Sequence, residues 1–215
     1  MKSLLIAVLV LTATFAGQAQ TREIYTHPDF KSLSRDHKTL AIVPFAAKLS
    51  LRPKEVEKAG GPEGVRDLER REGLAVQQAL HTYFLKEKGK DGLNVSFQDV
   101  ARTNALLERN GITPDKIAGY TPEELAKLLG VDGIISGTFE SSQPISNGAA
   151  IAMTALVGFS GSTNTGKTII NIHDGKTGEL LWKYDKSLSR GLGSDTGSII
   201  STIMRKAGRQ FPYEG

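Results

Sequence analysis

The apolar positions of the chain change between strand-like and helix-like spacing. Residues 39–45, Thr-Leu-Ala-Ile-Val-Pro-Phe, form a short apolar run with β-branched residues, which predicts a buried strand ending near Pro44. Between Val65 and Lys88 the apolar residues recur every three or four positions, so this segment predicts an amphipathic helix. Residues 94–98 then alternate as a second strand would.

Capping residues mark two further helices. Asp99 precedes an apolar pattern that runs to Gly111, and its carboxylate is suited to cap the first turn. Residues 121–124, Thr-Pro-Glu-Glu, form a capping box with proline at the first helical position. We expect the helix that begins there to end at Gly130, because glycine commonly follows the last helical residue.

The last third of the chain predicts three strands and a helix. Residues 132–139 form an apolar run, while 167–173 and 179–186 alternate around a turn sequence and predict a β-hairpin. Apolar residues at helical spacing over 199–211 predict the last helix. The order β-α-β-α-α-β-β-β-α predicts an α/β fold, a mixed parallel and antiparallel sheet with flanking helices.

The first residues have the pattern of a secretory signal. Residues 1–19 contain a positive charge, an uncharged apolar run and small residues at the expected cleavage site after Ala19. We expect residues 20–38 to form an N-terminal arm and residues 39–215 a single domain in the periplasm. The chain has no cysteine, so we expect neither a lipid anchor nor disulfide bonds.

Composition gives little support for a metal, cofactor or nucleic-acid site. The formal net charge is +4 over 215 residues, and the basic residues are scattered, so we expect no nucleic-acid partner. The four histidines, at positions 27, 37, 81 and 173, lack the spacing of metal ligands, and no thiolate is present. We therefore expect structural or surface roles for the histidines, and no cofactor.

A nucleotide-binding pattern is present. Residues 161–168, Gly-Ser-Thr-Asn-Thr-Gly-Lys-Thr, match G-x-x-x-x-G-K-[ST] at every fixed position. A P-loop leads into a helix whose N-terminus helps to bind phosphate, whereas residues 168–174 are β-branched and predict a strand. We interpret the match as a coincidence and keep a nucleotide hydrolase using Gly166, Lys167 and Thr168 as the third functional hypothesis.

Residues 141–166 form an uncharged insert rich in glycine and alanine. Its apolar centre, residues 149–159, is long enough for a membrane-spanning strand but too short for a spanning helix. Internal packing, an interface with a subunit or partner, and membrane insertion all stay open. In the hairpin, Trp182 fits a core or half-buried sheet residue, with a binding surface as the alternative. The insert and the hairpin together supply the candidate interaction surface: Ile151, Met153, Leu156, Val157, Phe159, Trp182 and Tyr184.

Several segments resemble a known group of proteins. They are Leu-Ala-Ile-Val-Pro-Phe at 40–45, Phe-Gln-Asp-Val at 97–100, Asn-Ala-Leu-Leu at 104–107, Glu-Leu-Ala-Lys-Leu-Leu-Gly-Val-Asp-Gly-Ile-Ile-Ser-Gly at 124–137 and Asp-Gly-Lys-Thr-Gly-Glu-Leu-Leu-Trp at 174–182. This pattern resembles the CsgG/LpoB/TolB-N-terminal-like group of secreted bacterial cell-envelope proteins. The resemblance implies an anticodon-binding-like α/β domain without catalytic residues. It also implies work in the envelope as a channel subunit, an activator or a translocation component.

The sequence therefore predicts a non-catalytic periplasmic protein that acts through protein contacts, with an unidentified envelope protein or with itself. The second hypothesis is an oligomeric, outer-membrane-associated secretion or assembly component that uses residues 149–159. Several members of the resembled group carry a lipidation cysteine, and the channel-forming members have two long membrane hairpins. This chain has no cysteine and one short candidate segment.

Overall fold

A computed structural model describes residues 22–89, 92–141, 165–189 and 211–213. The predicted signal, most of the uncharged insert and nearly all of the predicted last helix lie outside these ranges. In chain order the elements are β1 (Arg22–Thr26), α1 (Phe30–Leu33), β2 (Thr39–Ile42), β3 (Ala46–Leu49), α2 (Pro53–Lys58), α3 (Gly61–Lys88), β4 (Ser96–Phe97), α4 (Val100–Arg109), the 3-10 helix η1 (Pro114–Gly119), α5 (Pro122–Leu129), β5 (Gly133–Ser141), β6 (Thr165–Asp174) and β7 (Leu180–Ser189).

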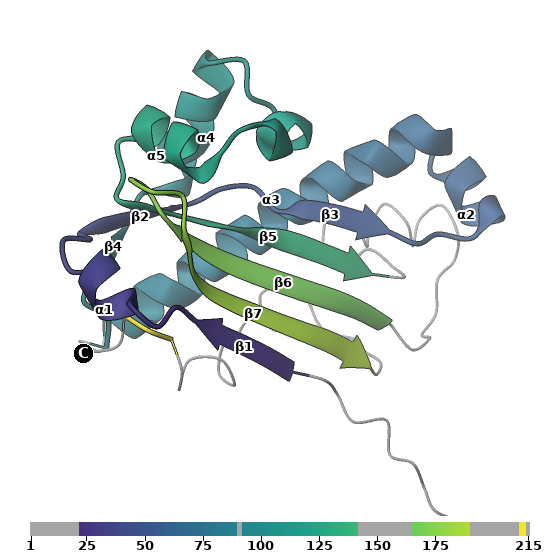
Figure 1. Ribbon diagram of the computed structural model, residues 1–215. Helices are drawn as coiled ribbons and strands as arrows, with labels where there is room; N and C mark the ends of the chain where they lie inside the picture. Colours follow the sequence, from purple (N-terminus) through teal and green to yellow (C-terminus); the bar gives the residue numbers. More distant parts are fainter. Residues whose placement is uncertain (1–21, 90–91, 142–164, 190–210, 214–215) are drawn as a thin grey trace, which may run out of the picture.

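The strands form one seven-stranded sheet in the order β1-β7-β6-β5-β2-β4, with β3 also paired to β5 (Figure 1). The strands β2 and β3 run parallel to β5, and β4 runs parallel to β2. The pairs β5–β6, β6–β7 and β1–β7 are antiparallel. The predicted α/β fold with a mixed sheet and flanking helices is confirmed.

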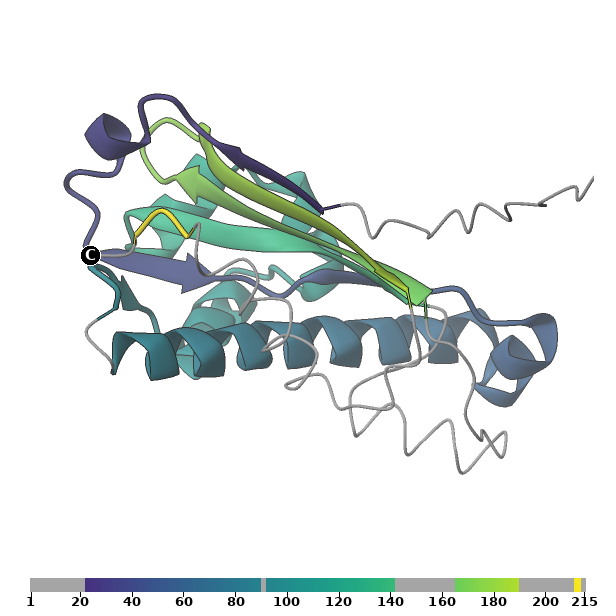
Figure 2. The same ribbon diagram turned by 90° about the horizontal axis from the view of Figure 1, so that it is seen from below.

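The two faces of the sheet carry different helices. Helix α3 runs along one face of the sheet, here called the α3 face (Figure 2). Its residues Val76, Leu80 and Phe84 pack in a large apolar cluster with residues of the sheet. On the opposite face, α4, η1 and α5 pack around Ile134 in a smaller cluster. This opposite face is called the groove face below. Among the residues with assigned positions, no helix is long and apolar enough to cross a membrane.

The helices follow their sequence signals. Asp99 accepts a hydrogen bond from the backbone N–H of Arg102 at 3.0 Å, which satisfies a free donor in the first turn of α4. The hydroxyl of Thr121 accepts from the backbone N–H of Glu124, whose carboxylate accepts in return from the N–H of Thr121. Gly130 ends α5 with φ +66°, a left-handed conformation that glycine adopts without strain.

The expected arm, and the segment after Phe45 for which no element was predicted, contain additional elements. Residues 22–26 of the expected arm form the edge strand β1, and Phe30 of α1 is buried against the core. The polar segment after Phe45 contains β3 and α2. A strand that pairs on one side and exposes alternate side chains needs no apolar run, and this is why the periodicity does not reveal β1.

The sheet and α3 meet most closely where β2 gives way to β3. At this break the N–H of Phe45 donates to the carbonyl of Gly73 in α3, with an N–O distance of 3.3 Å. A Cβ on Gly73 would lie 2.1 Å from the carbonyl oxygen of Phe45, and a Cβ on Gly137 would lie 2.5 Å from the Phe45 ring. Neither position has room for a side chain, so the approach requires glycine on both sides of Phe45.

Gly137→Ala is expected to destabilise the protein by about 2 kcal/mol or more, because the new methyl group would also lie 2.0 Å from the backbone oxygen of Ile169. Urea unfolding measures the change. The matched control is Gly119→Ala, which places a methyl group where no atom lies within 4 Å and should change stability by less than about 0.5 kcal/mol. Equal stability of both variants would contradict the packing at Phe45.

Candidate functional site

Two of the residues predicted for the interaction surface are buried in the core. Trp182 and Tyr184 have no exposed surface, and their rings stack at 6.0 Å on the α3 face. The expectation that they lie on an interaction surface is therefore corrected, because burial in the core removes both side chains from contact with a partner. The other five predicted residues lie outside the described ranges: Ile151, Met153, Leu156, Val157 and Phe159.

The nucleotide-binding pattern leads into a strand, as the alternation predicted. Its last four residues lie in β6, and residues 166–168 pair with both β5 and β7. Lys167 forms an ion pair with Asp185 at 2.9 Å, and this contact raises the pKa of the lysine. A P-loop needs a helix after the lysine to orient the following hydroxyl toward magnesium, and Thr168 is instead buried in the core.

A buried hydrogen-bonded chain joins three distant segments. The ring of His37 contacts the Tyr213 hydroxyl at 2.7 Å through Nδ1 and the Asp174 carboxylate at 2.8 Å through Nε2. The other oxygen of Asp174 accepts from the backbone N–H groups of Lys176 and Thr177 in the hairpin turn. Both ring nitrogens of His37 are used inside the protein. These hydrogen bonds therefore hold Tyr213 against the sheet.

The titration of these groups follows from their surroundings. Burial alone would raise the pKa of Asp174, but hydrogen bonds from His37 and Thr177 outweigh it and hold that pKa below its ordinary value. Burial raises the pKa of Tyr213, so its hydroxyl stays protonated. Desolvation lowers the pKa of His173, which lies on the groove face, and Glu123 opposes the shift.

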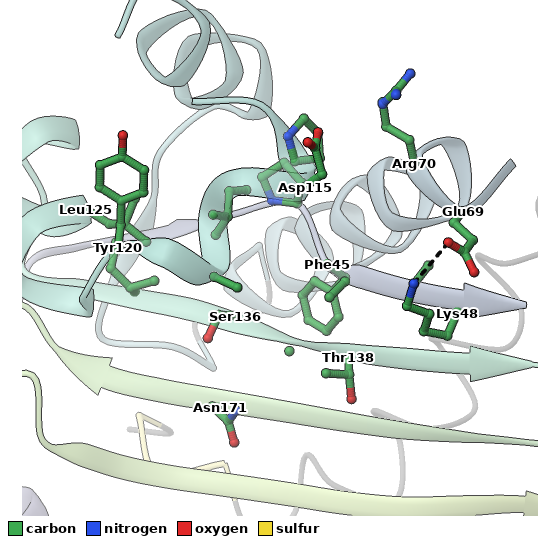
Figure 3. A pocket seen from close by; sticks show the side chains of 18 of the residues that line it. Phe45, Lys48, Glu69, Arg70, Asp115, Tyr120, Leu125, Ser136, Thr138 and Asn171 are labelled. Atoms are coloured by element: carbon green, nitrogen blue, oxygen red, sulfur yellow. Dashed lines mark hydrogen bonds and ion pairs between the residues drawn. The ribbon is translucent and has the colours of Figure 1, made fainter. Parts of the chain in front are cut away.

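A groove of about 540 Å³ opens on the groove face, between the η1–α5 segment and the sheet (Figure 3). Its apolar wall includes Ile117, Leu125 and Tyr120, and the Tyr120 side chain is 39% exposed. The N–H of Tyr120 donates to the carbonyl of Ile117, and the capping box begins at the next residue. The end of η1 and the start of α5 thus hold the aromatic side chain at the rim.

The floor of the groove consists of three neutral polar side chains, Ser136 and Thr138 of β5 and Asn171 of β6. Ser136 is directly opposite Asn171 in the register, and Thr138 is two residues farther along β5. All three are partly buried, and within the described part of the chain none has a hydrogen-bonding partner. The described residues therefore leave their donors and acceptors to a bound molecule.

Charged residues surround one end of the groove and are largely neutralised. Lys48 pairs with Glu69 at 3.3 Å, and Arg70 pairs with Asp67 at 2.8 Å. A hydrogen bond from the Thr113 side chain is the main cause that lowers the pKa of Asp115, and Arg70 adds to it. The charges at this end balance within the protein, so the groove favours a neutral hydrogen-bonding group over an ion.

The floor hydroxyl groups lack the contacts of an activated nucleophile among the described residues. Neither of them is hydrogen-bonded there to a histidine or a carboxylate. Within those same ranges, no cluster of three or more His, Asp or Glu residues could hold a metal ion. The arrangement offers hydrogen bonds and apolar contact, which suit recognition.

The amino-acid sequence alone does not reveal this site. Ser136, Thr138 and Asn171 are ordinary strand residues, separated by a long insert, and only the register of β5 and β6 brings them together. The one usable signal was alternation, since positions 134, 136 and 138 must share a face of the strand. That signal does not tell which face is open.

No family model and no curated protein matches the chain. Solved structures with a similar course of the chain include the lipoprotein GNA1162 from Neisseria meningitidis, with 14% identity over 80% of this chain and 96% of that one and a TM-score of 0.44. LpoB from E. coli has 11% identity over 88% and 79%, with a TM-score of 0.41. The PelC dodecamer from Paraburkholderia phytofirmans has 11% identity over 86% and 94%, with a TM-score of 0.36. With TM-scores below 0.5, none of them decides what this chain does.

Thr168→Val is expected to stabilise the protein by about 1 kcal/mol, because the Thr168 hydroxyl is fully buried without a hydrogen-bonding partner among the described residues. Thermal or urea unfolding measures the gain. The same exchange at the partly exposed Thr138 should change stability by less than about 0.5 kcal/mol.

The melting temperature should not respond to magnesium and ATP in either protein. A loss of stability in Thr168→Val, with an ATP-dependent shift in the parent chain that the variant lacks, would instead restore the nucleotide hypothesis.

Proposed function

We propose that this protein is a non-catalytic component of the bacterial cell envelope, and that it binds a polypeptide segment of a partner protein in the groove between η1–α5 and β5–β6. The observation that carries the proposal is the floor of the groove, where Ser136, Thr138 and Asn171 have no hydrogen-bonding partner among the residues with described positions. The periplasm remains the expected location, as predicted from residues 1–19.

The chemistry of the groove fits a peptide. Backbone amides are neutral and present one donor and one acceptor per residue, and the hydroxyl and carboxamide groups of the floor can pair with both. Ile117, Leu125 and the ring of Tyr120 provide an apolar wall for a side chain of the bound segment. Polar positioning groups beside an apolar wall are the usual composition of a recognition groove.

Burial distinguishes this surface from the rest of the sheet. The side chains of Trp182 and Tyr184 are committed to the core on the α3 face. On the groove face, α4, η1 and α5 cover Ile134, while Ser136 and Thr138 on the same strand stay partly exposed. The partner segment would therefore lie along β5 and β6 beside the end of η1.

The test is site-specific photo-crosslinking in cells that express the full chain. A photoreactive amino acid at Thr138 should give a discrete adduct that protease digests, because the side chain lies on the floor of the groove. Asn171→Trp fills the groove and should reduce that adduct at least about tenfold. The bound segment would lose two hydrogen bonds to Asn171 and the space it occupies.

The matched control uses Thr82, an exposed residue of α3. The photoreactive amino acid placed there should not give the same adduct, and Thr82→Trp should leave the adduct from position 138 unchanged. An adduct that resists protease, or one that Asn171→Trp does not reduce, would contradict a polypeptide in the groove.

A further inference from the structure

The edge strands of the sheet differ in how far neighbouring structure covers their backbone groups. Helix α3 runs beside β3 and accepts hydrogen bonds from the backbone along this edge. The N–H of Phe45, just before β3, donates to the carbonyl of Gly73, and the N–H of Leu49 donates to the carboxylate of Glu69 at 3.0 Å. A helix that uses these donors prevents another strand from pairing there. The edge at β4 is only two residues long.

Among the described strands, β1 has a neighbour on one side only. The N–H of His27 donates to the carbonyl of Leu181 at 2.8 Å, and in antiparallel pairing this fixes which backbone groups face β7. By alternation, the N–H and C=O groups of Arg22, Ile24 and Thr26 point away from β7. In the described ranges no strand pairs with β1 on that side.

We propose that β1 pairs antiparallel with β1 of a second copy of this chain, about a two-fold axis that passes beside Ile24. The outward backbone groups of Arg22, Ile24 and Thr26 then meet the same groups of the second copy. Arg22 lies opposite Thr26 of the second copy, and Ile24 lies opposite Ile24. The result is a continuous sheet across two molecules.

The side chains select this register among the three that join the outward groups. Pairing centred on Ile24 places Glu23 opposite Tyr25 of the other copy, so each carboxylate can accept a phenol hydrogen bond. Both side chains are exposed, and Tyr25 is among the large side chains with most exposed surface, at 42%. Centring on Glu23 would oppose two carboxylates, and centring on Tyr25 would pair fewer residues.

The pairing has a geometric consequence for the groove. Asn171 lies opposite Lys183, and Lys183 opposite Tyr25, so the floor of the groove and Tyr25 share a face of the sheet. A two-fold axis perpendicular to the sheet keeps this face on the same side in both copies. The two grooves of the dimer therefore open in the same direction, whatever each of them binds.

Sedimentation of the full-length protein over a series of concentrations tests the pairing. The protein should shift from monomer to dimer as concentration rises. Ile24→Pro removes an N–H that β7 does not use, and it should weaken the association by about thirtyfold through two lost hydrogen bonds. Ile24→Thr keeps the N–H and should still form the dimer. A monomer at every concentration, or equal association of both variants, would overturn the proposal.

A second measurement does not depend on the tolerance of β1 for proline. The chain contains no cysteine, so a single one reports its own contact. Ile24→Cys should form a disulfide-linked dimer on mild oxidation, because the two Cα atoms in this register would lie about 5.5 Å apart. Glu23→Cys faces Tyr25 instead and should remain mostly unlinked. The reverse order of the two yields would exclude this register.

Discussion

The close approach of Phe45 to two glycines determines how the molecule is assembled. Gly73 lets α3 reach the break between β2 and β3, and Gly137 lets the Phe45 ring lie on β5. These contacts hold α3 on one face and close the β3 edge with groups of the same helix. They commit the largest apolar side chains to the α3 face, and the opposite face is left to a shorter helical layer that forms a groove with the sheet.

The polar side chains that hold the fold together differ from those on the floor of the groove in charge and in hydrogen-bonding partners. Ionisable side chains at the joints of the fold are paired: His37 with Asp174 and Tyr213, and Lys167 with Asp185. The side chains on the floor of the groove, which have no partner within the described ranges, are neutral and partly exposed. A neutral, partly buried floor costs little to desolvate and can discriminate by hydrogen-bond geometry, which is how a peptide groove gains specificity.

Local signals predicted local structure well. The capping residues at 99 and 121 and the helical spacing over 65–88 gave three helices, and the turn at 174–178 gave the hairpin. What depends on pairing between distant strands was not predictable. Alternation placed Trp182 and Tyr184 on one face without telling that this face is the core, and Asn171 reached Ser136 only through the register of β5 and β6. The strand β1 escaped prediction because one neighbour suffices for an edge strand.

The most direct measurement is an NMR titration of the protein with N-methylacetamide, a neutral molecule with the donor and acceptor of one peptide group. If the groove binds a peptide group, the NMR chemical shifts of the backbone around Ser136, Thr138 and Asn171, and of the Tyr120 ring, should change saturably. The signals of α3 should stay unchanged. Shifts spread evenly over the surface, or none at the floor of the groove, would contradict the assignment of this groove as the recognition site.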